Sequence, residues 1–186
     1  MVEDTNPWQV TGSRNIYEND WIGVTEYEVI NPSGGRGIYG KVHFKNKAIG
    51  IIPIDEDGNT YLVGQFRFPI NRYSWEIPEG GSPESEDPLS CAQRELLEET
   101  GLRAASWEEL LQMDMSNSVT DESAIIFIAR DLTQHQASPE ETEQLSVKKV
   151  SIEKAYEMVQ NGEIRDSLSI AGILKLILLK LESKEF

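Results

Sequence analysis

The sequence predicts an α+β sandwich, a fold in which helices cover a β-sheet. Runs rich in β-branched and aromatic residues dominate the first third of the chain and return after residue 120, with amphipathic helical patterns between and after them. A sheet must bury its apolar face, and helices placed in this way can cover it. The 186 residues and the hydrophobic fraction of 39% fit a single core.

The first part of the chain is predicted to form paired strands. Residues 21–30 and 37–45 flank the turn sequence NPSGG, and residues 48–54 and 60–68 flank DEDGN. Gly, Pro, Asn and Asp between two such runs are typical of hairpin turns. We therefore expect two β-hairpins.

An acidic helix is predicted between Asp87 and Gly101. Asp87 can accept hydrogen bonds as the N-cap, Pro88 suits the first helical position, and Gly101 suits the left-handed residue after the last turn. Apolar residues recur at helical spacing and form the stripe expected to face the core: Leu89, Ala92 and Leu96.

The rest of the chain is predicted to contain two strands followed by two helices. The expected elements are a buried strand at 123–132, a strand at 146–152, a helix at 152–162 capped by Ser151 and ended by Gly162, and a longer amphipathic helix at 167–182 capped by Asp166.

The composition excludes several classes of partner. The net charge of −15 leaves no basic stripe for a nucleic acid polymer. The single cysteine, Cys91, suits a reducing compartment, and the N-terminal sequence has no basic and apolar pattern typical of a secretory signal. The apolar stretches are too short to span a bilayer, so we expect no membrane association and a cytoplasmic location.

Residues 76–102 carry eight carboxylates and a single basic residue, Arg94. Glu95, Glu98 and Glu99 stand at i, i+3 and i+4, so they share one face of the predicted helix. Like charges at this spacing repel, and Arg94 offers a partner to Glu98 only. The cluster is either a solvated acidic face or a set of oxygen ligands for Mg²⁺ or Mn²⁺.

The whole segment resembles the Nudix box, the signature of hydrolases acting on a nucleoside diphosphate linked to another moiety. The box is a glycine, five residues, a glutamate, seven residues, then Arg-Glu-apolar-any-Glu-Glu-any-Gly-apolar. Every fixed position is filled, by Gly80, Glu86, Arg94, Glu95, Leu96, Glu98, Glu99, Gly101 and Leu102.

The resemblance implies an α/β/α sandwich with a mixed central sheet and a role for each box residue. Glu95 and Glu99 would ligate metal ions, with Glu98 assisting or sharing a second ion. Arg94 would orient a neighbouring carboxylate, and the backbone carbonyl of Glu79 would complete the coordination. The implied cofactor is Mg²⁺, with Mn²⁺ as a possible substitute.

Residues outside the box are similar to the branch that acts on ADP-ribose and nucleoside diphosphate sugars. The stretch QFRFPINRYSWEIPEGG places Arg67 and Glu76 where that branch binds substrate. Glu79 stands where the branch has alanine. After the box, SNSVTDE has Asn117 in place of proline but keeps Glu122, which would contact metal or sugar hydroxyls, with a solvated loop carboxylate as the alternative.

The general base of this branch comes from an acidic loop before a late strand. In PEETEQLSV the resemblance assigns Glu141 as the base and Glu143 as a second metal contact or as the residue that holds the loop. Neighbouring glutamates leave the choice between them open.

The N-terminal portion is longer than a minimal Nudix domain. The resemblance implies that residues 1–46 add an antiparallel sheet exchanged across a homodimer, as part of the same domain as the Nudix portion, 47–186. Tyr17, Trp21 and Tyr39 are candidates for stacking on the nucleobase, with ordinary packing as the alternative.

Three functions remain open at this point. The first is metal-dependent hydrolysis of ADP-ribose or a related nucleoside diphosphate sugar to a nucleoside monophosphate and a sugar phosphate. The second is hydrolysis of (d)NTPs or dinucleoside polyphosphates by the same chemistry. The third is a non-catalytic nucleotide-binding module, which need not keep the intact box found here.

Overall fold

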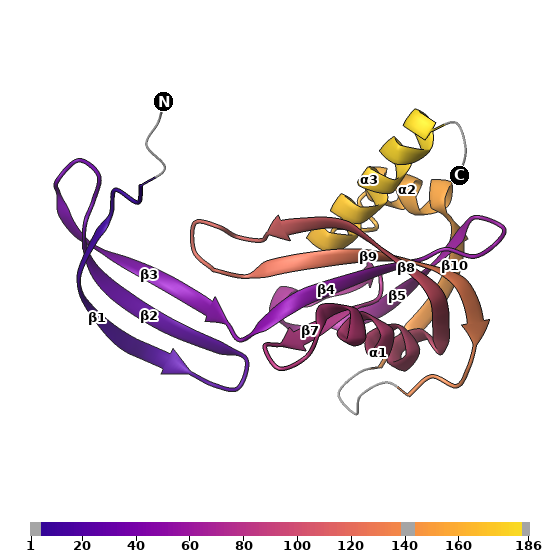
Figure 1. Cartoon of the computed structure of the whole chain (residues 1–186), viewed down its shortest axis with the longest axis horizontal. Coiled ribbons are helices and arrows are strands. Elements are labelled where there is room, and N and C mark those ends of the chain that lie inside the picture. The colour runs from indigo at the N-terminus through magenta and orange to yellow at the C-terminus, as the bar shows by residue number, and fades with distance from the viewer. Residues whose placement is uncertain (1–4, 139–143, 184–186) are drawn as a thin grey trace. The chain divides into compact units, whose positions relative to one another are not determined.

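The computed structural model describes residues 5–138 and 144–183. The described chain divides into two compact units, the first formed by residues up to 46 together with 114–123 and the second by the remainder. Figure 1 follows the chain through its strands and helices from the N-terminus to the C-terminus.

The first unit is built on a three-stranded antiparallel sheet in the order β1-β2-β3. Its strands are β1 (Gln9–Glu18), β2 (Ile22–Ile30) and β3 (Arg36–Phe44). Strands β2 and β3 pair along their whole lengths across NPSGG, which confirms the first predicted hairpin. Strand β1 was not foreseen because two register shifts interrupt its pairing with β2, and nearly all of it is exposed, so its sequence carries no regular alternation.

The second unit contains a four-stranded sheet in the order β7-β4-β9-β8. The strands are β7 (Glu79–Pro83), β4 (Asn46–Pro53), β9 (Ser123–Gln134) and β8 (Leu102–Asp114). Strands β4 and β9 run parallel and are largely buried, which explains their nearly continuous apolar sequences.

A second sheet of this unit has the order β10-β5-β6, with both pairs antiparallel. It is formed by β10 (Ser146–Ser151), β5 (Asn59–Arg67) and β6 (Arg72–Glu76). The second predicted hairpin is therefore wrong. Strands β4 and β5 lie in different sheets and meet only at the bridge between Ile54 and Thr60, because β4 takes a central place between β7 and β9.

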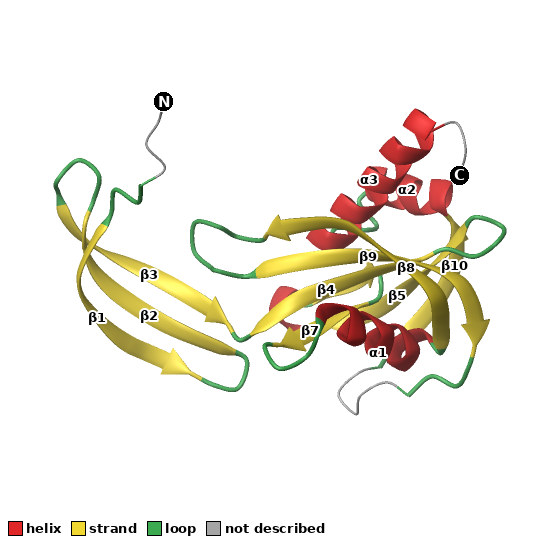
Figure 2. Cartoon of the chain, viewed as in Figure 1, coloured by secondary structure: helices red, strands yellow, loops and turns green. Residues whose placement is uncertain are grey.

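The described residues of the second unit also form three α-helices and one 3₁₀ turn (Figure 2, helices in red). They are α1 (Pro88–Thr100), α2 (Ile152–Gln160), α3 (Ser167–Ser183) and the turn at Phe68–Ile70. The predicted caps are confirmed, since side-chain oxygens accept from backbone N–H groups at each helix start: Asp87 from Ser90 at 3.0 Å, Ser151 from Lys154 at 3.1 Å, and Asp166 from Ser169 at 2.7 Å.

Helices cover both faces of the four-stranded sheet, with α1 on one side and α3 on the other (Figure 1). On the α1 side, fully buried Ala92 and Leu96 pack with Ile49 and Ile51. On the α3 side, a Cβ at Gly172 would lie 2.8 Å from Ile52, so the helix approaches the sheet closely. The architecture confirms the predicted α/β/α sandwich with an additional antiparallel sheet. Among the described residues no helix is both long enough and apolar enough to cross a membrane.

Candidate active site

The helix α1 is fixed at both ends, and this fixes the direction of its acidic side chains. Asp87 caps the first turn, and Gly101 ends the helix with φ at +72°, donating its N–H to the carbonyl of Leu97. Buried Cys91 anchors the face that meets the sheet, and burial raises the pKa of its thiol to about 12. The thiol is therefore a core group without nucleophilic character at neutral pH.

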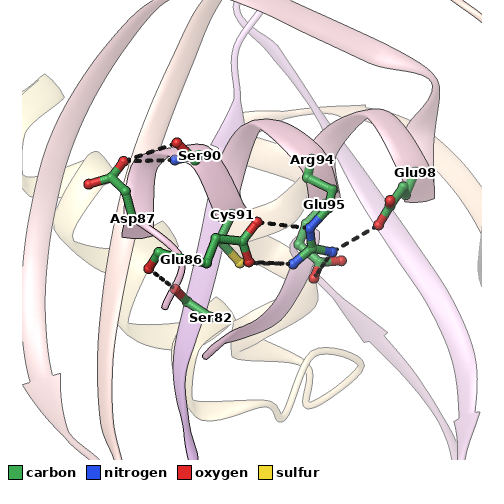
Figure 3. A network of polar contacts seen from close by, with 8 residues as sticks. All are labelled: Ser82, Glu86, Asp87, Ser90, Cys91, Arg94, Glu95 and Glu98. Atoms are coloured by element: carbon green, nitrogen blue, oxygen red, sulfur yellow. Dashed lines mark hydrogen bonds and ion pairs between the residues drawn. The ribbon is translucent and has the colours of Figure 1, made fainter. Parts of the chain in front are cut away.

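Arg94 holds three carboxylates of the acidic segment together. Its Nε and Nη2 donate to the two oxygens of Glu86 at 3.1 and 2.9 Å. Its Nη1 donates to Glu95 at 2.8 Å and to Glu98 at 3.0 Å (Figure 3). Because of the Arg94 hydrogen bonds, the pKa of Glu86 is lowered. One guanidinium thus offsets much of the repulsion that the crowded carboxylates impose on the helix.

Glu99 connects the same helix to the start of β7. Its carboxylate is 2% exposed, and Oε2 accepts the backbone N–H of Glu79 at 3.0 Å. A Cβ at Gly80 would lie 2.0 Å from the carboxyl carbon of Glu95. Only glycine at position 80 lets the Glu95 carboxylate lie against this strand, so Glu95 and Glu99 both converge on the Glu79–Gly80 backbone.

Arg67 lies on the other side of that backbone, at the end of β5. Its guanidinium donates to both oxygens of Glu76, at 2.6–3.1 Å, and also to Glu79. Glu76 is almost fully buried, which makes this a strong paired contact. Sequence reasoning placed Arg67 and Glu76 near the diphosphate but did not foresee that Glu79 would join them.

The side chain of Glu79 is the least satisfied carboxylate of this region. Its Oε2 is buried and has no hydrogen-bond partner. Burial raises the pKa of Glu79 well above its usual value, and the nearby carboxylates of Asp166 and Glu76 raise it further. A buried oxygen without a partner marks a position that is completed by a proton, a cation or a ligand donor.

The residues around the Glu79–Gly80 backbone fit a divalent cation by their chemistry. Carboxylate and carbonyl oxygens are the ligands that Mg²⁺ and Mn²⁺ prefer. As they stand, no three acidic, His or Cys side chains of residues 5–138 and 144–183 are grouped to hold an ion, because Glu95 and Glu98 face Arg94. An ion at this backbone would require these two carboxylates to turn from Arg94, whereas Glu99 already lies there.

The predicted aromatic residues lie in the first unit. Tyr17 and Trp21 are 54% and 66% exposed. Tyr39 is tied down more firmly, since its hydroxyl donates to the carbonyl of Ser118 at 2.6 Å and its ring meets Trp8 edge to face at 5.3 Å. Trp8 was not singled out in the sequence, where nothing distinguishes it from a packing residue.

Glu122 also lies in the first unit, and burial raises the pKa of its carboxyl. Glu141 and Glu143, the predicted base and its neighbour, lie outside the described residues. Of the remaining predicted residues, Arg94, Glu95, Glu98, Glu99, Glu79, Arg67 and Glu76 form one continuous region of the second unit.

Comparison with family models gives two matches along the chain. Residues 44–169 match the model described as NUDIX domain. Residues 8–42 match the model described as nucleoside diphosphate sugar hydrolase N-terminal domain. The second match covers β1, β2 and all but the last two residues of β3.

Two curated relatives are similar over the central part of the chain. An ADP-ribose pyrophosphatase of Mycobacterium tuberculosis is 35% identical over 131 residues, which are 68% of this chain and 63% of that protein. An ADP-ribose pyrophosphatase of Bacillus subtilis is 31% identical over 128 residues, 68% of this chain and 69% of that protein. The chain thus aligns with somewhat under two thirds of the first relative's length.

A solved structure described as an ADP compounds hydrolase has the same fold. It superposes with a TM-score of 0.86 over 96% of this chain and 97% of that one, at 17% identity.

Proposed function

The chain belongs to the Nudix family, and on that premise we propose that it hydrolyses the diphosphate linkage of ADP-ribose or a related nucleoside diphosphate sugar. The products are a nucleoside monophosphate and a sugar phosphate. The observation that carries the proposal is the convergence of Glu95 and Glu99 on the Glu79–Gly80 backbone, with Arg67 on its other side. The match of residues 8–42 and the names of the two relatives support this substrate class.

The family uses divalent metal ions, and we propose Mg²⁺ for this chain, with Mn²⁺ able to replace it. Glu95, Glu98, Glu99 and the carbonyl of Glu79 would hold the metal, with Glu143 as a further contact. A bound divalent ion neutralises the diphosphate and lowers the pKa of the attacking water.

The proposed work of the chain's own residues is positioning and proton transfer. Arg94 orients the neighbouring carboxylate of Glu86, as its two hydrogen bonds to Glu86 support, and stays in place when Glu95 and Glu98 turn to the metal. When substrate binds, Arg67 gives up some of its hydrogen bonds to Glu76 and Glu79 and donates two hydrogen bonds to the diphosphate instead. Glu141 accepts the proton of the water that forms the new P–O bond, while the bond to the leaving phosphate breaks.

The proposed assembly is a homodimer in which the N-terminal strands are exchanged, with residues 1–46 and 47–186 as parts of one domain. Exposed apolar and aromatic side chains on the sheet of the first unit support it: Val10, Ile16, Tyr17, Trp21 and Ile38. In this assembly Tyr17 and Trp21 stack on the nucleobase and Glu122 contacts the sugar or the metal. We also propose a cytoplasmic location, which the single reduced cysteine supports.

Formation of nucleoside monophosphate from a substrate panel, followed by chromatography, with Mg²⁺ and then with a chelator, tests the proposal. The panel holds ADP-ribose, several nucleoside diphosphate sugars, (d)NTPs and dinucleoside polyphosphates. Turnover of ADP-ribose or sugar nucleotides that stops on chelation is the expected result. Turnover confined to triphosphates or dinucleoside polyphosphates, or tight binding without turnover, contradicts it.

A further inference from the structure

A cavity of about 440 Å³ opens in the second unit, and Glu79 is one of the residues that line it. This volume lies within the range of small-molecule sites. Its charged lining residues come from β5, β6, β7 and the start of α3: Arg67, Arg72, Glu76, Glu79, Arg165 and Asp166.

The carboxylates of this cavity already have partners in the protein. Glu76 and Glu79 both accept hydrogen bonds from Arg67. Asp166 accepts the backbone N–H of Ser169 at 2.7 Å and so caps α3. Each of these three carboxylates therefore has at least one hydrogen-bond donor in the protein.

Two of the three arginines that line the cavity, Arg72 and Arg165, differ from these carboxylates. Arg72 and Arg165 are exposed at the cavity, and neither guanidinium forms an ion pair with any carboxylate in the described part of the chain. Two guanidinium groups at one cavity, neither paired with a described carboxylate, form a site for a carboxylate or a phosphate group.

The floor of the cavity offers a further, separate contact. Glu79 lines it, and the Oε2 atom of Glu79 is a buried acceptor without a partner. Because this oxygen is shielded from solvent, a ligand hydroxyl would satisfy it once the Glu79 side chain turns towards the cavity. Two residues before Glu79, the N–H of Ile77 donates to the buried Ser169 hydroxyl at 2.9 Å, which ties this segment to α3.

We propose that this cavity receives the sugar half of the substrate, and that Arg72 and Arg165 select nucleoside diphosphate sugars whose sugar carries an anionic group. This inference rests on the proposed function and names its substrate class. A sugar hydroxyl donates to Glu79, and a carboxylate or phosphate on the sugar lies between the two arginines. The diphosphate then lies at the Glu79–Gly80 backbone, which borders both the box helix and the cavity.

Hydrolysis of a matched substrate pair tests the selection. UDP-glucuronate and UDP-glucose share the nucleotide and differ by one carboxylate on the sugar. The wild type is expected to show a higher kcat/KM for UDP-glucuronate. Arg72→Gln and Arg165→Gln each lower the ratio of the two kcat/KM values about 10-fold, the loss typical of one charge-assisted contact. Arg103→Gln, an exposed arginine on β8, leaves this ratio and the basal activity unchanged.

Binding without turnover separates this inference from the proposed function. Calorimetry without metal measures the affinity for glucuronic acid 1-phosphate and for glucose 1-phosphate. The wild type and Arg103→Gln are expected to bind glucuronic acid 1-phosphate more tightly than glucose 1-phosphate, and Arg72→Gln and Arg165→Gln are expected to lose this preference. This result supports the cavity assignment even if no sugar nucleotide is hydrolysed. No binding, equal affinity for both, or a preference that survives in the two variants overturns it.

Discussion

Gly80→Ala tests how closely strand β7 and the box helix must approach. The added Cβ would lie 2.0 Å from both the carboxyl carbon and Oε1 of Glu95, and 2.5 Å from its Cγ. Real Cβ contacts are essentially never closer than 3.0 Å. The Glu95 carboxylate must therefore move by about 1 Å or more, because it is the flexible end of a side chain and the strand is not.

The effect on activity should be much larger than the effect on stability. A displacement of about 1 Å in a catalytic constellation costs on the order of 10²-fold in rate. The fold should change by no more than about 1 kcal/mol, because alanine reduces the entropy of the unfolded chain while Glu95 can rotate away. We expect kcat/KM to fall about 10²-fold with little change in the urea midpoint.

Steady-state hydrolysis of ADP-ribose and urea unfolding of the same preparations measure the two effects. Gly37→Ala is the matched control, since a Cβ there meets nothing within 4 Å. Parent activity in Gly80→Ala would show that Glu95 need not lie against β7. A loss of several kcal/mol in the free energy of unfolding would show that the clash is taken up by the backbone instead.

The remaining predictions concern four further positions. Glu99→Gln should lower activity by more than the ~10–100-fold typical of an outer-shell partner, and it should weaken Mg²⁺ binding in calorimetry. The fold of this variant should survive, because the amide oxygen of glutamine can still accept the backbone N–H of Glu79. Arg94→Gln should lower the free energy of unfolding by about 1–2 kcal/mol in urea, because three carboxylates lose a common partner that is one third exposed, and Mg²⁺ should reduce this deficit. Asp121 should contribute to acid stability: burial raises its pKa, but donors on β3 outweigh this and hold the pKa at about 2, below 3.8. The stabilisation that Asp121 provides is thus present above about pH 4 and lost as the pH falls towards 2. Asp121→Asn should lower the free energy of unfolding by about 1–2 kcal/mol at neutral pH and make it less dependent on pH between 4 and 2. Glu141→Gln should lower kcat with metal affinity unchanged.

Each of these predictions has an outcome that contradicts it. Turnover of Glu99→Gln at the parent rate removes Glu99 from the metal site. If Mg²⁺ does not change the loss of unfolding free energy in Arg94→Gln, the hydrogen bonds of Arg94 are not coupled to metal binding. An unaltered acid transition in Asp121→Asn shows that its hydrogen bonds add nothing, and an equal kcat loss in Glu143→Gln alone moves the general base.

The elements with local signals were predictable from the sequence. Asp87, Pro88 and Gly101 define α1 because capping depends on neighbouring residues only, and the structure bears them out. Ser151 and Asp166 define the starts of α2 and α3 in the same way. The convergence of Glu95 and Glu99 on one side of α1 follows directly from their spacing.

Features that depend on distant pairing were not predictable in the same way. The hairpin expected from residues 48–54 and 60–68 fails because strand partners are chosen by the whole sheet, and β9 and β7 take the places beside β4. Strand β8, with its run SWEELLQM, has residues that favour helix, and its sheet environment overrides that preference. The contact of Arg67 with Glu79 depends on the bend at Pro78 between β6 and β7; Pro78 and Gly80 signal a bend, but they do not show which side chains it brings together.

The central claim is that carboxylates of the box helix gather a divalent ion at the Glu79–Gly80 backbone. Isothermal titration of Mg²⁺, and separately Mn²⁺, into the protein with a non-hydrolysable ADP-ribose analogue measures this directly. The account predicts saturable binding that Glu99→Gln weakens and Arg103→Gln leaves intact. A protein that binds neither ion while holding the nucleotide analogue would contradict it.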